Sequence, residues 1–248
     1  LKSKNINVNI NDFEKEMEKQ RDIARSSWKG SGDESYEKLY LKLESLYQQT
    51  NFIGYDNLNC DAKILCIIHC NKIVSEISNG VEAEIILNRT VFYSTSGGQI
   101  HDNGYIENKK FKADIQDCIK TNNGISIHKI IVREGILKTG DKVYLDVYKE
   151  NRNLTACNHT STHILHQALK DVLGNHISQK GSLVTPKRLR FDFSHPNPIN
   201  QNIFIKIESI INKKIRDNTN VLIREMNIKE AKNEGATALF GEKYGDIV

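Results

Sequence analysis

The spacing of hydrophobic and polar residues changes twice along this chain. Near the N-terminus, apolar residues recur at helical spacing among charged ones, which predicts helices over about residues 12–27 and 35–48. Beyond them the apolar runs become short and are separated by turn residues such as Asn79-Gly80 and Asn123-Gly124. These runs predict strands at about residues 62–70, 81–87, 104–106, 111–118, 125–131 and 142–148. Short strands at this spacing are typical of a small antiparallel β-barrel or sandwich.

Helical spacing returns in the last part of the chain. The strongest run predicts a helix over residues 155–173 that ends near Gly174. The pattern further predicts strands at about residues 179–184, 188–193 and 220–226, helices at about 199–216 and 227–233, and the start of a strand at Ile247. A helical segment, a barrel and a mixed segment together make an α+β protein. We expect domains at residues 1–50, 51–150 and 151–248.

Composition narrows the class of protein. The chain has 248 residues, of which 38% are hydrophobic and 27% charged, and its formal net charge is +4. The mild positive charge permits nucleic-acid binding without requiring it. No apolar run reaches the ~18 residues that a membrane-spanning helix needs, so we expect no membrane partner. Because the chain begins with Leu1 and ends inside an expected strand, we expect it to be part of a longer protein.

The cysteines indicate the redox state of the protein's compartment and do not indicate a disulfide framework or a metal site. The chain has 5 cysteines at irregular spacing and no visible secretory signal, which favours a reducing, cytoplasmic compartment over a disulfide framework. In a strand, Cys66 and Cys70 would share one face with Ile68, and His69 would point away from them. We therefore interpret Cys66 and Cys70 as core groups rather than as metal ligands.

Two histidines carry the strongest chemical signal. His159 and His163 lie one helical turn apart, which places both imidazoles on one face with Cβ atoms about 6 Å apart. This spacing suits two ligands of a tetrahedral Zn²⁺, but no Glu follows His159, as a metalloprotease would need. Spacing alone leaves a chance pair open. A zinc site needs a third and usually a fourth ligand, for which His176 and His195 are possible, whereas we interpret His166 as a satisfied surface side chain.

Two polar segments are candidates for ligand contacts. Ser94–Gln99 contains Gly97 and Gly98 before a polar amide, so its backbone N–H groups could meet a phosphate or a carboxylate, and a plain turn is the alternative. In the run 188–193, alternation places Arg188, Arg190 and Asp192 on one face. That face lines a cleft or belongs to an ordinary amphipathic strand.

Longer stretches around these motifs share their order and spacing with one family. They are residues 92–104, 158–169, 178–184, 189–195 and 235–245. Together they resemble the editing domain of the alanyl-tRNA synthetase family. Upstream, Phe13–Arg25 resembles the end of the helical tRNA-recognition region of that family, and Asn51–Tyr55 resembles the beginning of its β-barrel.

The resemblance implies both a fold and an activity. The full-length enzyme joins alanine to its tRNA with ATP and Mg²⁺ in a synthetic domain that lies outside this chain. This region would be an editing core of the type shared by threonyl- and alanyl-tRNA synthetases, which hydrolyses mischarged Ser- and Gly-tRNA. His159 and His163 match zinc ligands, and the remaining ligands are expected beyond Val248 in a Cys-x-x-x-His motif. We therefore expect this chain alone to bind zinc weakly and to hydrolyse slowly.

The same resemblance assigns roles to further residues. Thr162 and Gln179 match positions that line the editing pocket, and a hydroxyl next to a ligand could sense the extra oxygen of serine. Arg188 and Arg190 are candidates for phosphate contacts with the acceptor end of tRNA(Ala). We expect Gly97, Gly98 and Gln99 to contact tRNA as well. Zn²⁺ would position the ester or activate water.

Two alternatives remain beside an alanyl-tRNA synthetase fragment. One is a free-standing alanyl-tRNA editing protein, against which the match of Phe13–Arg25 argues. The other is a non-catalytic RNA-binding module that has lost its zinc site. We expect a cytoplasmic parent, with an organellar form as the alternative, and the sequence leaves the oligomeric state open.

Overall fold

The computed structural model describes residues 12–19, 34–222, 224–236 and 245–248, which fall into two compact units, Leu1–Tyr47 and Gln48–Val248. In the first unit, residues 12–19 are helical, and the rest of the helix predicted over 12–27 lies outside the described residues. The second helix of this unit is α2 (Glu34–Leu46), which confirms the helix predicted at about 35–48.

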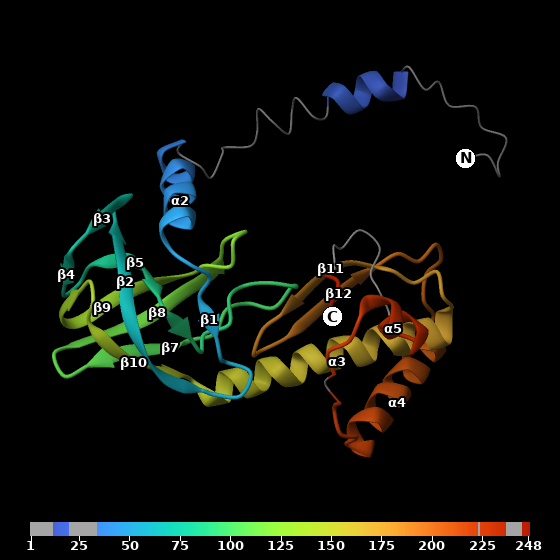
Figure 1. Cartoon of the computed structure of the whole chain (residues 1–248). Helices are drawn as coiled ribbons and strands as arrows, with labels where there is room; N and C mark the ends of the chain where they lie inside the picture. The colour runs from blue at the N-terminus through green and yellow to red at the C-terminus, as the bar shows by residue number, and fades with distance from the viewer. Residues whose placement is uncertain (1–11, 20–33, 223, 237–244) are drawn as a thin grey trace. The chain divides into compact units, whose positions relative to one another are not determined.

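The second unit begins with a closed barrel. Six antiparallel strands follow one another around it, each hydrogen-bonded to the next: β2 (Asn59–His69), β5 (Glu82–Leu87), β9 (Ser126–Lys138), β8 (Phe111–Lys120), β7 (Gly104–Asn108) and β10 (Lys142–Val147). Strand β10 then pairs with β2 and closes the ring (Figure 1). All six predicted strands are confirmed. Because β10 has partners on both sides, the fold is a barrel and not a sandwich.

Shorter strands that the sequence pattern did not indicate extend the barrel. Strand β3 (Lys72–Val74) pairs with β2, and β4 (Glu76–Ser78) pairs with β9. Strand β1 (Asn51–Phe52) pairs in parallel with β6 (Arg89–Thr90) in a separate two-stranded sheet. Each has two or three residues, too few to show an alternation of apolar and polar positions.

The barrel interior is mainly apolar, and it also contains a buried imidazole that is hydrogen-bonded to a buried hydroxyl. Its core includes Ile64, Ile85, Leu87, Phe92, Ile106, Ala113, Ile130 and Leu145, all fully buried. His128 on β9 lies completely inside as well, with Nε2 2.8 Å from the hydroxyl of Thr90. Burial lowers the pKa of His128 to about 4, so the imidazole is neutral at neutral pH.

The α+β part follows the barrel. Helix α3 (Lys149–Leu173) is succeeded by a hairpin of β11 (Gln179–Val184) and β12 (Leu189–Phe193), and then by α4 (Gln201–Asp217) and α5 (Ile228–Asn233) (Figure 1). Phe191 and Phe193 pack on a core formed by Ala168, Leu169, Ile177 and Ile207. The α+β fold class with an antiparallel barrel is thus confirmed.

Two of the predicted elements differ from the structure. Helix α3 begins at Lys149 rather than at Thr155, because its first turns are polar and lack the apolar spacing that marks a helix in the sequence. The strand predicted at 220–226 is wrong for the described residues there. Met226 only exchanges two backbone hydrogen bonds with Val248, at 3.0 and 2.9 Å, next to an isolated bridge between Asn227 and Ile247.

Candidate functional site where the barrel meets helix α3

The two histidines predicted as metal ligands lie together on helix α3. The imidazole rings of His159 and His163 stack with their centroids 5.1 Å apart and their planes at 14°. His159 is half-buried and His163 is exposed. Burial first, and then the neighbouring His163, lowers the pKa of His159, so its neutral form with a free lone pair is favoured.

Gln99 from the barrel selects which nitrogen of His159 is free. Its side-chain oxygen Oε1 lies 2.6 Å from Nδ1 of His159. Because a carbonyl oxygen can only accept, Nδ1 carries the proton and donates it, which leaves the lone pair on Nε2. A hydrogen bond of this kind to the outer nitrogen is how proteins orient imidazoles that ligate metals.

The glycine loop places Gln99 at this position. Its backbone joins the end of β11: the carbonyl of Gly98 accepts from the N–H of Val184 at 2.7 Å, and Ile100 donates to the carbonyl of Val184 at 3.1 Å. Gly98 has φ +82°, and a Cβ there would lie 2.8 Å from Cβ and the carbonyl oxygen of Ser182. Only glycine allows this approach without strain or a shift of β11.

A buried ion pair fastens the start of α3 to the barrel. Arg152 Nε donates to Asp102 Oδ1 at 2.7 Å, and a second guanidinium nitrogen donates to Asp102 Oδ2. The guanidinium also donates to the carbonyls of Gly54, at 2.5 Å, and Val91, at 2.7 Å. We call these contacts the Arg152 clamp. The sequence gives no local sign of this clamp, because no motif marks an arginine whose partners are far away in the chain.

The predicted pocket residue Thr162 lies on α3 with the two histidines, and Gln179 lies on β11, whose other end pairs with the glycine loop. Thr162 is buried, and its hydroxyl donates to the backbone carbonyl of Asn158 at 2.8 Å, one turn back in α3. Gln179 is half-buried at the first position of β11 and pairs with Phe193 of β12.

The predicted phosphate contacts lie on the exposed side of the β11–β12 hairpin. Arg188 is exposed in the turn, where its N–H donates to the Thr185 hydroxyl at 3.0 Å. Arg190 is exposed on β12 and pairs with Asp192 at 3.1 Å. The alternation predicted for this run is confirmed, since the phenylalanines at the intervening positions pack inward.

The described residues do not form a complete metal site. No group of three or more His, Cys, Asp and Glu side chains that could hold a metal ion occurs among them. His176 and His195, which the sequence offered as further ligands, bond to each other, with Nε2 2.9 Å from Nδ1. A neutral imidazole with a defined free nitrogen, next to a second imidazole, fits half of a tetrahedral zinc site.

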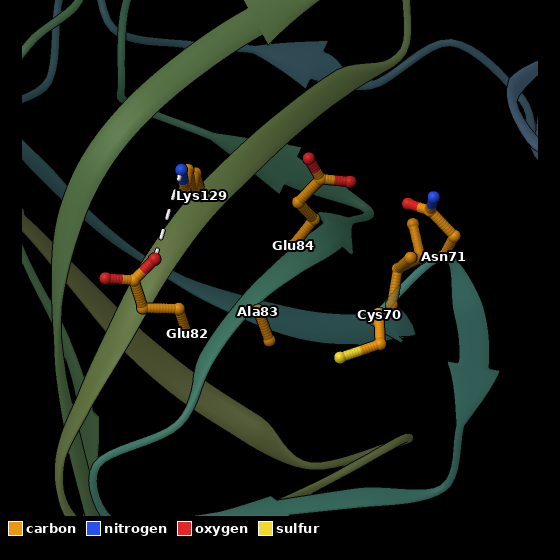
Figure 2. Close-up of a pocket in the computed structure, with 7 residues that line it drawn as sticks. Cys70, Asn71, Glu82, Ala83, Glu84 and Lys129 are labelled. Atoms are coloured by element: carbon orange, nitrogen blue, oxygen red, sulfur yellow. Dashed lines mark ion pairs between the residues drawn. The ribbon is translucent and has the colours of Figure 1, made fainter. Parts of the chain in front are cut away.

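The structure corrects the interpretation of Cys70. Cys66 is buried as expected, but Cys70 is exposed in the β2–β3 turn with φ +48°, which ends the strand alternation. Its sulfur lies 3.4 Å from Nε2 of His69. Figure 2 shows the pocket at this turn, where Lys129 forms an ion pair with Glu82 at 4.0 Å. This thiol is neither a core group nor part of a three-ligand cluster within the described chain.

His166 also differs from the expectation of a satisfied surface side chain. It is half-buried, and its ring lies 5.0 Å from that of Phe191. Its Nε2 is buried without a hydrogen-bond partner among the described residues. Burial, more than the nearby Lys170, lowers the pKa of His166, which keeps this imidazole neutral.

None of the helices in the described ranges is long and apolar enough to cross a membrane.

Comparison with known proteins identifies the family. The family of tRNA synthetases class II (A) matches residues 1–151. An alanine–tRNA ligase of Listeria monocytogenes serotype 4b is 48% identical over 236 residues, which are 95% of this chain and 27% of the relative. An alanine–tRNA ligase of Sinorhizobium medicae is 41% identical over 248 residues, which are 100% of this chain and 28% of the relative. The chain thus spans little more than a quarter of these relatives, and it belongs to the class II (A) tRNA synthetase family.

Proposed function

We propose that this chain is the editing region of an alanine–tRNA ligase. The parent would ligate alanine to its tRNA with ATP and Mg²⁺, and this region would hydrolyse mischarged Ser- and Gly-tRNA with the help of Zn²⁺. The observation that carries the proposal is the contact between Gln99 and Nδ1 of His159, at 2.6 Å. It leaves Nε2 of His159 free beside the stacked ring of His163. The names of the relatives support the same parent.

His159 and His163 would hold the metal in this proposal, with further ligands from outside the described residues. A bound Zn²⁺ supplies a Lewis acid that polarises the ester or its attacking water. Gln99 holds His159 in the ligating tautomer. Thr162 and Gln179 would line the pocket for the aminoacyl group.

The exposed hairpin would hold the nucleic acid. Arg188 and Arg190 present guanidinium groups to solvent at its turn and on β12, where phosphates of the acceptor end can reach them. Gly97 and Gly98 would approach the tRNA through their backbone. The parent would act in the cytoplasm, in keeping with five free cysteines within the described chain.

The test uses the full-length parent with wild-type or variant His163. We expect His163→Gln to lower bound zinc, measured by elemental analysis, and to slow Ser-tRNA(Ala) hydrolysis by about 100-fold or more. Alanine ligation should stay unchanged, because the synthetic domain is separate. His176→Gln is the matched control, since His176 is an exposed histidine that pairs with His195.

Unchanged zinc content and unchanged Ser-tRNA(Ala) hydrolysis in both His159→Gln and His163→Gln would overturn the proposal. A wild-type protein that binds tRNA but neither holds zinc nor hydrolyses Ser-tRNA(Ala) would favour the non-catalytic RNA-binding alternative instead.

A further inference from the structure

A partly exposed group of aromatic rings lies beside the glycine loop. It consists of Phe52 at the end of β1, Tyr55 in the turn that follows, and Tyr93 before the loop. The Phe52 and Tyr55 rings meet edge to face, with centroids 5.0 Å apart and planes at 86°. Phe52 and Tyr93 meet in the same way, at 6.2 Å and 74°. Tyr55 is 83% exposed, so most of its ring surface is free for a ligand.

These rings line a pocket of about 160 Å³ together with polar groups. The polar groups are the side chain of Lys120 at the end of β8 and the serines Ser94, Ser96 and Ser126. Lys120 is exposed, and no carboxylate in the described part of the chain lies within ion-pair distance of its ammonium. The pocket therefore combines aromatic faces, hydroxyl groups and an unpaired positive charge.

The backbone under the pocket is held in place. A Cβ at Gly54 would lie 2.6 Å from the Phe52 ring, so the ring packs directly against a glycine. The carbonyl of Gly54 accepts from Arg152 at 2.5 Å, which ties this turn to α3. The Tyr93 hydroxyl donates to the carbonyl of Ser96 at 3.4 Å, and burial raises the pKa of Tyr93, so it stays a neutral phenol. The platform is thus preformed rather than a loose surface patch.

The pocket and the histidine pair share one short loop. Ser94 and Ser96 line the pocket, and Gln99 of the same short loop contacts His159 at 2.6 Å. The loop therefore connects the aromatic pocket with the His159 side chain.

We propose that this aromatic pocket binds an unpaired base near the 3′ end of the RNA, and so delivers the aminoacylated ribose to the histidine pair; this step rests on the proposed function. Unpaired bases bind proteins by stacking on aromatic side chains, with phosphates on nearby cations and base edges on hydroxyls. The pocket offers all three groups. Tyr55 supplies the stacking face, Lys120 the phosphate contact, and Ser96 a polar partner for a base edge.

The experiment uses this chain and an RNA hairpin whose unpaired 3′ end carries 2-aminopurine, a base whose fluorescence falls on stacking. We expect Tyr55→Ala to raise the Kd about 5- to 150-fold, the range that corresponds to one stacked base. Tyr55→Phe should keep both the affinity and the quenching, because the stacking face remains. Lys120→Gln should lower the slope of log Kd against log salt by about one.

Tyr144→Ala is the matched control, because Tyr144 is an exposed tyrosine on β10 outside the pocket. Its Kd should equal that of the unaltered chain. Circular dichroism and unfolding midpoints establish that each variant is folded. Equal Kd and equal quenching for folded Tyr55→Ala and Tyr144→Ala would overturn the proposal, and so would binding of the hairpin that does not depend on its unpaired end.

The outcome can be separated from that of the proposed function. If zinc-dependent Ser-tRNA(Ala) hydrolysis is present but Tyr55→Ala leaves the Kd unchanged, the aromatic pocket is not the base site and the editing proposal stands. If Tyr55→Ala weakens RNA binding in a parent that shows no hydrolysis, the base site stands and the editing proposal fails.

Discussion

Removal of the Arg152 guanidinium tests how strongly the barrel and helix α3 are coupled. Arg152→Met keeps the length of the side chain but leaves Asp102 without its charge partner, with only the N–H of Tyr93, at 2.7 Å, still donating to it. The carbonyls of Gly54 and Val91 lose a donor as well. The side chains of Arg152 and Asp102 are only 15% and 4% exposed, so water replaces these bonds poorly.

The expected cost follows from this burial. Breaking a buried ion pair by removing one partner destabilises a protein by about 3–5 kcal/mol. We expect Arg152→Met to lower the free energy of unfolding by that amount, measured by urea denaturation followed by circular dichroism. The contact between Gln99 and His159 should loosen at the same time, because the clamp holds the start of α3 against the segment that carries Gln99.

A second ion pair provides the control for burial. Arg133 Nε lies 2.7 Å from Asp114 Oδ2, but these side chains are 55% and 29% exposed. Arg133→Met should therefore cost less than about 1 kcal/mol. A double change, Arg152→Met with Asp102→Asn, should recover part of the loss, because no buried charge remains. Equal losses for Arg152→Met and Arg133→Met, both below about 1 kcal/mol, would refute the reasoning.

Three further predictions address the barrel core, the loop and the metal. Burial lowers the pKa of His128 from 6.5 to about 4 in the folded state, so on acidification a proton binds this residue in the unfolded chain first. The contribution of neutral His128 to the free energy of unfolding is therefore complete above pH 6.5 and is lost as the pH falls towards 4. We expect this loss to be about 3 kcal/mol, measured as the difference between the free energies of unfolding in urea at pH 7 and pH 4. A His128→Phe variant should lack this part of the pH dependence. Gly98→Ala should lower the free energy of unfolding by about 1–3 kcal/mol more than Gly80→Ala. Both glycines have positive φ, but only a Cβ at Gly98 would meet a neighbouring strand. Equal unfolding midpoints for the two variants would contradict this prediction. Gln99→Leu should weaken zinc binding of the full-length parent about 10- to 100-fold in a competition assay with a fluorescent chelator, whereas Gln167→Leu, on an exposed part of α3, should not.

Local spacing determined much of this protein. Short apolar runs between turn residues marked all six strands of the closed barrel, because a strand that faces a core is apolar and ends where the chain turns. The helical interval between His159 and His163 placed both rings on one face of α3, since neighbours one turn apart face the same way. The alternation in β12 likewise separated its charged face from its packed one.

Only the tertiary structure determined how the strands close into a barrel and which distant side chains meet. Closure of the sheet depends on pairing between β10 and β2, which no local pattern in either strand encodes. Cys70 lies outside the core because its backbone, with φ +48°, forms a turn that ends the strand alternation. The backbone conformation of a single residue cannot be seen in the spacing of apolar residues. The partnership of Gln99 with His159 and that of Asp102 with Arg152 span 60 and 50 residues of sequence. Such contacts exist only once the barrel has closed and α3 has packed against it, because packing and not spacing brings distant side chains within bonding distance.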